Sequence, residues 1–204
     1  MKHNMTLYLV TEESISIDSF LTVVEQAIKG GVTIVQLREK NSSGRDFYEK
    51  AKALKGLLDY YQIPLIINDR IDIAIAVKAA GVHVGQTDLP IWIVKEIVPS
   101  SFIIGVSVAT LEEAKNAELE GANYIGVGSA FPTGTKSDAK LLSKGVLEEI
   151  TKTVSIPVVA IGGITLENVS SLQDRGIAGV AVVSAIMKAA DPFYAAQQFR
   201  LKLK

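Results

Sequence analysis

The sequence contains no cysteine and only two histidines, His3 and His83, among its 204 residues. Disulfide bonds, thiolate nucleophiles and cysteine-based zinc sites are therefore excluded. His3 is among the first residues, and His83 stands inside a short apolar segment, where we expect a packed or rim histidine and not a catalytic one. A serine–histidine triad or a two-histidine metal site is therefore not predicted. Any chemistry must rest on carboxylates, basic side chains, amides and hydroxyls.

The sequence also lacks an excess of one charge and lacks long apolar runs. Its 21 Lys and Arg nearly balance its 22 Asp and Glu, which gives a net charge of −1 at pH 7. No basic field for nucleic acid is present, and recognition by charge must be local. No window reaches about 18 uninterrupted apolar residues, and the first residues carry no apolar stretch of secretory length. We expect no nucleic-acid partner, no membrane association and a cytoplasmic location, and the oligomeric state is left open.

The sequence does contain a regular alternation of short apolar runs and helical patterns. Continuous apolarity is typical of parallel strands that are buried on both faces. The eight runs are residues 7–10, 34–37, 65–68, 82–84, 103–106, 124–127, 157–161 and 179–183. Eight strand–helix units without a linker rich in Ser or Pro predict an α/β fold, a (β/α)8 TIM barrel formed as a single domain by residues 1–204. The count of eight favours this barrel over an open doubly wound sheet.

Helix signals fill the gaps between the runs. Apolar residues recur at helical spacing at Phe20, Val24, Ala27 and Ile28, before a stop at Gly30–Gly31. Thr110 and Glu113 form the pattern of a capping box, and Asp191–Pro192 predicts the start of the last helix. The helix at 71–80 is short. The loop at 128–142 is long, which is typical of functional or disordered loops.

Polar residues follow the apolar runs, where the active sites of such barrels lie. After the second run, Gln36, Arg38 and Lys40 alternate, and the period of a strand would turn them to one face. Gln36 lies deep in the run, where an amide without a partner would be costly. We therefore favour a binding role, although Arg38 and Lys40 could instead be solvated charges at the rim.

Two carboxylates, Asp69 and Asp88, follow the third and fourth runs. On adjacent strands they would repel each other unless a cation lay between them. Mg²⁺ is held in this way by one or two carboxylates together with substrate phosphate oxygens. The alternative is that each carboxylate caps the helix that follows it. With the basic residues of the second run nearby, we favour a Mg²⁺ site.

The remaining strand ends carry features suited to an anion. Ser107 ends the fifth run and is expected to donate a hydrogen bond, because no histidine base is available to activate it. The loop 131–136 could wrap an anion with backbone N–H groups and one lysine, although an ordinary polar loop is equally compatible. Residues 162–165 and 183–186 each open a helix, as in the phosphate sites of many barrels, unless the glycines serve only tight turns. Two anion sites on opposite halves of the rim predict an enzyme with two phosphorylated substrates.

At these positions the chain resembles the thiamine phosphate synthase family. The resemblance covers nearly the whole chain and follows the order of the motifs QLREK, IINDRIDIA, GVHVGQTD, GVS, FPTGTK, AIGGI and GVAVVSAI. It implies a transferase of thiamine biosynthesis, with Mg²⁺ as cofactor, that moves an aminopyrimidine-methyl group from its diphosphate ester to the nitrogen of a thiazole phosphate. Thiazole tautomerases are similar over much of the barrel but tend to carry histidine in the loop of Ser129, where many synthases carry proline. A non-catalytic sensor of a phosphorylated ligand is a further alternative.

The resemblance also implies roles for individual residues. The pyrimidine diphosphate would be bound by Gln36, Arg38, Lys40, Asn68, Ser107 and Lys136. The thiazole phosphate would be bound by Thr133, Gly134, Thr135, Gly163, Val183 and Ser184. The ligands of Mg²⁺ would be Asp69 and Asp88, and the catalytic contacts would be Lys136, Ser107 and Arg38. No general base is needed in such a reaction, because the thiazole nitrogen is already nucleophilic.

Overall fold

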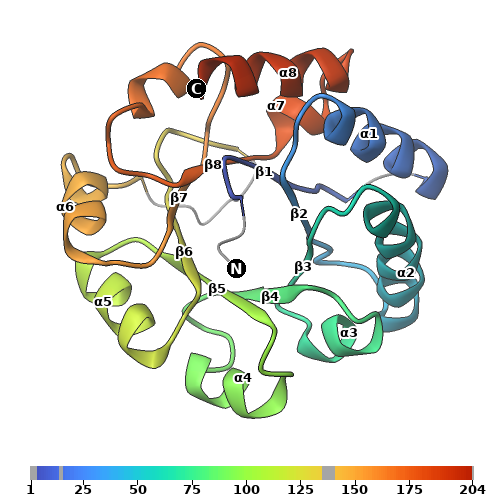
Figure 1. Ribbon diagram of the computed structural model, residues 1–204, viewed down its shortest axis with the longest axis horizontal. Helices are drawn as coiled ribbons and strands as arrows, with labels where there is room; N and C mark the ends of the chain where they lie inside the picture. The colour runs from blue at the N-terminus through green and yellow to red at the C-terminus, as the bar shows by residue number, and fades with distance from the viewer. Residues whose placement is uncertain (1–3, 14–15, 135–140, 204) are drawn as a thin grey trace.

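Eight parallel strands close into a barrel in the computed structural model, which describes residues 4–13, 16–134 and 141–203. Each strand pairs with the next along the chain, and the last pairs with the first (Figure 1). The strands are β1 (Leu7–Val10), β2 (Ile34–Leu37), β3 (Leu65–Asn68), β4 (Gly81–Val84), β5 (Ile103–Val108), β6 (Tyr124–Val127), β7 (Val158–Ile161) and β8 (Gly179–Val182). The predicted TIM barrel in a single domain is confirmed.

An outer ring of helices surrounds the strands (Figure 1). The helices are α1 (Ile17–Lys29), α2 (Gly44–Tyr60), α3 (Ile71–Ala76), α4 (Ile91–Ile97), α5 (Leu111–Glu120), α6 (Val146–Thr153), α7 (Ser184–Met187) and α8 (Pro192–Lys202). Helix α8 packs against α1 and so completes the ring. The capping signals behave as predicted: Thr110 and Glu113 form a capping box, and the Asp191 side chain accepts a hydrogen bond from the Tyr194 N–H at 2.9 Å.

One expected helix is absent among the described residues. After β7 the chain forms only the 3₁₀ turn η1 (Val169–Leu172), so the α-helix predicted to open at 162–165 was wrong. Short polar side chains compete here for the backbone groups that a helix would use. The Asn168 amide donates to the Gly163 carbonyl at 2.8 Å, and the Ser171 hydroxyl donates to the Asn168 carbonyl at 2.7 Å.

The strands separate two apolar cores. The larger lies between the strands and the helices, and the smaller fills the inside of the barrel. Tyr8 and Tyr124 are the largest side chains of the inner core, and each is almost completely buried. A Cβ atom at Gly105 would lie 2.1 Å from Cζ of Tyr124, so glycine at this inward position makes room for the tyrosine ring.

Substitution of Gly105 should therefore destabilise the protein. We expect Gly105→Ala to lower the free energy of unfolding by about 1–3 kcal/mol, because an added methyl group overpacks a filled interior. Urea denaturation measures this change. The matched control is Gly56→Ala in α2, where an added Cβ meets no atom within 4 Å and alanine is the better helix former. Equal effects of the two substitutions would contradict this account of the barrel interior.

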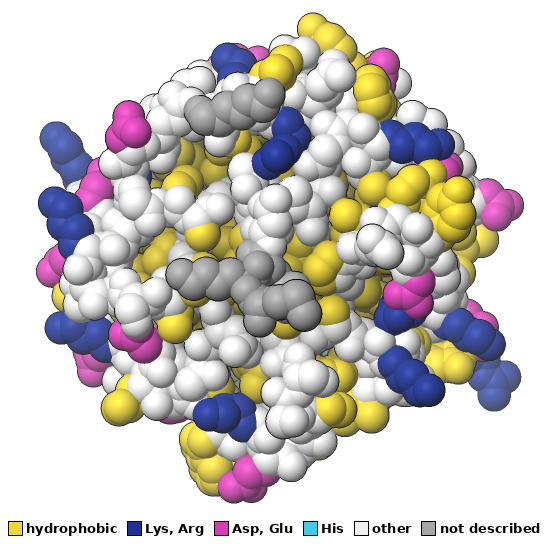
Figure 2. Space-filling view, viewed as in Figure 1, with side chains coloured by type: hydrophobic (Ala, Val, Ile, Leu, Met, Phe, Trp, Pro, Cys, Tyr) yellow, Lys and Arg dark blue, Asp and Glu magenta, His cyan; other side chains and the backbone are white. Residues whose placement is uncertain are grey.

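The outer surface shows no dominant sign of charge on the face seen in Figure 2. Lys and Arg side chains are interspersed with Asp and Glu around its outer ring, as expected for a nearly neutral chain. In the ranges that the structure describes, every helix is too short or too polar to cross a membrane.

Candidate functional site

Lys40 and Asp69 form an ion pair just beyond the ends of β2 and β3, where Nζ of the lysine contacts Oδ2 of the carboxylate. The Asp69 N–H donates to the His83 carbonyl at 2.8 Å, one step beyond the end of β3. Asp69 has a φ of 60°, in the left-handed region that aspartate and asparagine tolerate better than most residues. Its side chain is 24% exposed, so the carboxylate is held at the rim but remains accessible to a ligand.

Neither predicted metal ligand caps a helix. The N-cap of α3 is Arg70 and that of α4 is Pro90, and neither helix has a side-chain capping bond. Asp88 instead folds back over its own loop, where Oδ2 accepts a hydrogen bond from the Gly85 N–H at 2.7 Å. The helix-capping alternative for Asp69 and Asp88 is therefore wrong.

The donor set at this rim fits Mg²⁺ that is shared with a substrate. The described part of the chain contains no cluster of three or more His, Cys, Asp or Glu side chains that could enclose a metal ion. Asp69 directly follows β3, and Asp88 lies in the exposed loop after the adjacent strand β4; one or two carboxylates are the usual protein contribution to a Mg²⁺ site, in which phosphate oxygens and water supply the remaining ligands. The role of Asp69 and Asp88 as metal ligands stays a prediction.

Gln36 is buried inside the barrel, where its Nε2 donates to the Tyr8 hydroxyl at 2.8 Å. The interpretation that its burial has no purpose without a ligand was therefore wrong. On the opposite half of the barrel, the half-buried Ser107 has its Oγ 2.8 Å from Nε2 of His83, so the premise that no histidine is available to this serine was wrong. Asn68, at the end of β3, is also buried. The three residues occupy strand ends on the same rim as Asp69.

A series of hydrogen bonds crosses the barrel interior between Gln36 and Ser107. The Tyr8 and Tyr124 hydroxyls are 2.7 Å apart, and the Tyr124 hydroxyl lies 2.9 Å from Nδ1 of His83. Burial raises the pKa of both tyrosine hydroxyls above the ordinary value, so both stay protonated around neutral pH. We refer to Gln36, Tyr8, Tyr124, His83 and Ser107 as the interior network.

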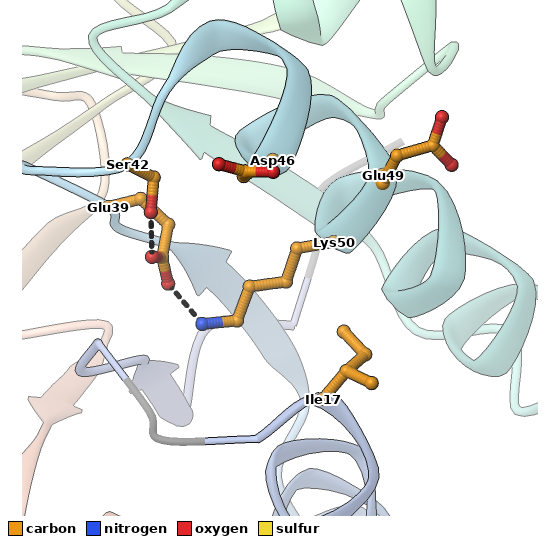
Figure 3. A pocket seen from close by; sticks show the side chains of 6 residues that line it. All are labelled: Ile17, Glu39, Ser42, Asp46, Glu49 and Lys50. Carbon is orange, nitrogen blue, oxygen red and sulfur yellow. Dashed lines mark hydrogen bonds and ion pairs between the residues drawn. The ribbon is translucent and has the colours of Figure 1, made fainter.

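Just beyond β2, the Glu39 side chain points away from Asp69 and toward helix α2. A cavity of about 340 Å³ lies between the start of α1 and the first turns of α2 (Figure 3). Three of its polar side chains bind one another: Lys50 Nζ is 2.5 Å from Glu39 Oε1, and the Ser42 hydroxyl donates to Glu39 Oε2 at 2.7 Å (Figure 3). This satisfied ion pair is a structural contact between β2 and α2. Lys40 lies on the side of Asp69, and the half-buried Arg38 binds Thr11 through its backbone N–H.

The Glu39–Lys50 pair predicts a large loss of stability when one partner is removed. The two side chains are only 3% and 12% exposed. We expect Lys50→Met to lower the free energy of unfolding by about 3 kcal/mol, because it leaves a buried carboxylate unpaired. The double variant Glu39→Gln/Lys50→Met should lose less than the sum of the two single changes. Chemical denaturation of the three variants tests this, and simple additivity would contradict direct pairing.

On the opposite half of the rim, the turn after β7 has two glycines with positive φ, 101° at Gly162 and 62° at Gly163. A Cβ at Gly163 would lie 2.3 Å from the Pro132 carbonyl oxygen, so glycine allows the loop after β6 to pack on this turn. Asn168 organises the turn, since its Oδ1 accepts from the Thr165 N–H at 2.9 Å. The glycines thus serve a tight turn and a close backbone approach together.

The loop after β6 is held against the same turn. The Phe131 N–H donates to the Gly162 carbonyl at 3.0 Å, and the Leu142 N–H returns to the Ser129 carbonyl at 2.9 Å. The described loop runs on to Thr133, which is half-buried, and Gly134, which is exposed. The predicted site residues Thr135 and Lys136 lie outside the described residues.

After β8, the short helix α7 begins at Ser184, as predicted, with Val183 as its N-cap. Ser184 is exposed and Val183 half-buried at this end of the strand. The structure therefore brings polar or anion-compatible groups to both halves of the predicted rim.

Sequence reasoning missed Tyr8, Tyr124 and Asn168. Each tyrosine lies within an apolar run, and nothing in the sequence indicated that the two hydroxyls would join one hydrogen-bond network. Glycines at inward positions of neighbouring strands, such as Gly105, were the available signal that large side chains fill the barrel. His83 was expected to be a packed or rim histidine, and it is buried.

Comparison with known proteins identifies the family. A family model described as thiamine monophosphate synthase matches residues 7–186. A thiamine-phosphate synthase of Methanobrevibacter smithii is 50% identical over 201 residues, which cover 98% of this chain and 96% of that protein. Another of Ruminiclostridium cellulolyticum is 54% identical over 191 residues, covering 93% and 91%. A solved structure of thiamine phosphate pyrophosphorylase from Pyrococcus furiosus has a TM-score of 0.90 and 40% identity, covering 99% of this chain and 96% of that chain. The resemblance seen in the motifs is confirmed: the chain belongs to the thiamine monophosphate synthase family of enzymes.

Proposed function

We propose that this protein condenses 4-amino-2-methyl-5-(diphosphooxymethyl)pyrimidine with a thiazole ethyl phosphate to give thiamine phosphate and diphosphate. The bond between the methylene carbon and the diphosphate oxygen breaks, and its electron pair leaves with diphosphate. The thiazole nitrogen then donates its lone pair to the same carbon and becomes a cationic ring nitrogen. No proton is transferred in this reaction. This agrees with a sequence that has no cysteine and only two histidines, His3 and the buried His83.

The observation that carries this proposal is the pairing of Lys40 with Asp69 at the same rim as the glycine turn after β7. The first group combines a cation, a carboxylate and the neighbouring amides of Gln36 and Asn68, which suits a diphosphate joined to a polar heterocycle. The second group offers backbone N–H groups and Ser184, which suit a monophosphate. The name of these relatives, thiamine-phosphate synthase, agrees with thiamine phosphate as the product.

Charge neutralisation on the leaving diphosphate is the main catalytic demand. Mg²⁺ bound by Asp69 and Asp88 would supply Lewis-acid stabilisation of the phosphate oxygens. Arg38, Lys40 and Lys136 are proposed to neutralise the remaining charge, and Ser107 to orient the pyrimidine. Thr133, Gly134, Thr135, Gly163, Val183 and Ser184 are proposed to position the thiazole phosphate. Fixing both substrates in one geometry provides the remaining acceleration.

A single reaction tests the proposal. Purified protein is mixed with both phosphorylated heterocycles and Mg²⁺, and mass spectrometry follows thiamine phosphate while a coupled assay follows free diphosphate. Stoichiometric formation of both products is expected. Aromatisation of a thiazole tautomer without pyrimidine would identify a tautomerase instead, and tight ligand binding without products would identify a sensor.

A cytoplasmic location stays a prediction.

A further inference from the structure

The interior network links two residues of the proposed pyrimidine site that stand on opposite halves of the barrel. Gln36 belongs to β2 and Ser107 to β5, and three buried side chains connect them. Every step is within hydrogen-bond distance: 2.8 Å from Gln36 to Tyr8, 2.7 Å on to Tyr124, 2.9 Å to His83 Nδ1, and 2.8 Å from Nε2 to Ser107. The donor and acceptor roles at Gln36 are therefore coupled to those at Ser107.

The direction of this series follows from its first donor. An amide nitrogen has only hydrogens to give, so Gln36 Nε2 donates to the Tyr8 oxygen. In the arrangement that gives each tyrosine hydrogen one of these acceptors, Tyr8 donates to Tyr124, and Tyr124 donates to Nδ1 of His83. A neutral imidazole that accepts at Nδ1 carries its hydrogen on Nε2 and donates it to Ser107. In this arrangement Ser107 accepts from His83 and keeps its own hydroxyl hydrogen to donate to a ligand.

The same logic fixes the polarity of Gln36. Its nitrogen gives one of its two hydrogens to Tyr8, and its Oε1 can only accept, so Oε1 is the acceptor that Gln36 can offer to the site. An aminopyrimidine offers the complementary pair, with N–H donors on the amino group and acceptors at the ring nitrogens. The opposite direction of the network would reverse both ends at once, with an amide donor at Gln36 and an acceptor at Ser107, and would require the aminopyrimidine to bind with its donor and acceptor edges exchanged.

We propose that Tyr8, Tyr124 and His83 are positioning residues that form a one-way hydrogen-bond network across the barrel, holding Gln36 as an acceptor and Ser107 as a donor for the aminopyrimidine. This inference rests on the proposed function for its ligand, but the direction of the network is a property of the protein alone. Both tyrosine hydroxyls are buried and protonated, so each can pass on one hydrogen only. Room for the network is provided by glycine, since a Cβ at Gly126 would lie 3.3 Å from Cε1 of His83.

The first test reads the imidazole directly and needs no substrate. Long-range ¹H–¹⁵N NMR distinguishes the two neutral tautomers of histidine, and a His3→Gln variant assigns the signals, because the chain has only two histidines. We expect His83 in one neutral tautomer with hydrogen on Nε2. In Tyr124→Phe, Nδ1 loses its donor and the second tautomer should become populated. Hydrogen on Nδ1 in the wild type, or an unchanged tautomer in Tyr124→Phe, would overturn the proposal.

The second test separates positioning from a purely structural role. Tyr124→Phe should raise KM for the pyrimidine diphosphate about fivefold to tenfold, as expected for loss of one net hydrogen bond, with KM for the thiazole phosphate within twofold. The matched control is Tyr61→Phe, which removes a hydroxyl that donates to Glu25 at 2.6 Å in the outer ring of helices. A lower unfolding midpoint with both KM values unchanged would overturn the positioning role. If the wild type formed no thiamine phosphate, the proposed function would be wrong. The direction of the interior network would still be tested by the histidine tautomer, because that measurement needs no substrate.

Discussion

Asp69→Asn is expected to lower turnover by at least about 10²-fold, the size of effect seen when one charge contact to a transition state is lost. Asparagine is the sharpest replacement, because it keeps the side-chain shape and tolerates the left-handed φ of 60° at this position. Alanine would add backbone strain to the loss of charge and blur the interpretation. Steady-state assays with both substrates at saturation measure the change.

The chain offers a matched control for this substitution. Asp174 also has a φ of 60°, but it lies in the exposed connection that leads into the start of β8, at the other end of the barrel. Asp174→Asn should leave turnover within twofold of the wild type, and both variants should unfold at similar temperatures. Turnover by Asp69→Asn within twofold of the wild type would remove this carboxylate from the mechanism.

Removal of divalent ions is expected to stop the reaction, with turnover falling at least about 10²-fold in excess chelator and returning when Mg²⁺ is added beyond the chelator. Stabilisation of the leaving diphosphate by a metal contributes several kcal/mol, and each 1.36 kcal/mol is worth about tenfold in rate. Full turnover in excess chelator would refute the metal assignment.

The Mg²⁺ concentration for half-maximal turnover gives a finer test of the same site. Asp88→Asn should raise it, because the site loses one of two carboxylates. Asp72→Asn is the control, since this carboxylate is 65% exposed and pairs with Arg70 at 2.6 Å. An equal shift in both variants would indicate a general effect of charge and not the loss of a ligand.

The fold followed from the sequence because parallel strands buried on both faces leave a strong signal. Each of the eight apolar runs overlaps an observed strand, Thr110 and Asp191 cap helix starts through their side chains, and α1 stops at Gly30, before Gly31 with its positive φ. The helix after β7 was mispredicted because Asn168 and its neighbouring serines satisfy backbone groups locally. Such competition depends on side-chain direction, which periodicity does not report.

The candidate site was predictable in part. The positions of Lys40 and Asp69 followed from the rule that barrel strands present their last residues at one rim, and their contact agrees with it. The role of Glu39 did not follow, because only the three-dimensional structure turns it toward Lys50. The partners of Gln36 were also hidden, since Tyr8 and Tyr124 come from strands that the sequence does not place face to face.

The exchange of volume between Gly105 and Tyr124 has a consequence for engineering the substrate range. Beneath the rim, the Tyr124 ring occupies the space that a side chain at position 105 would need. Side-chain volume can therefore be exchanged between these two positions on adjacent strands. A smaller residue at position 124 would open a hollow that a larger residue at position 105 could refill from the other side. Paired substitutions at these two positions would therefore redistribute space beneath the rim while keeping the strand framework.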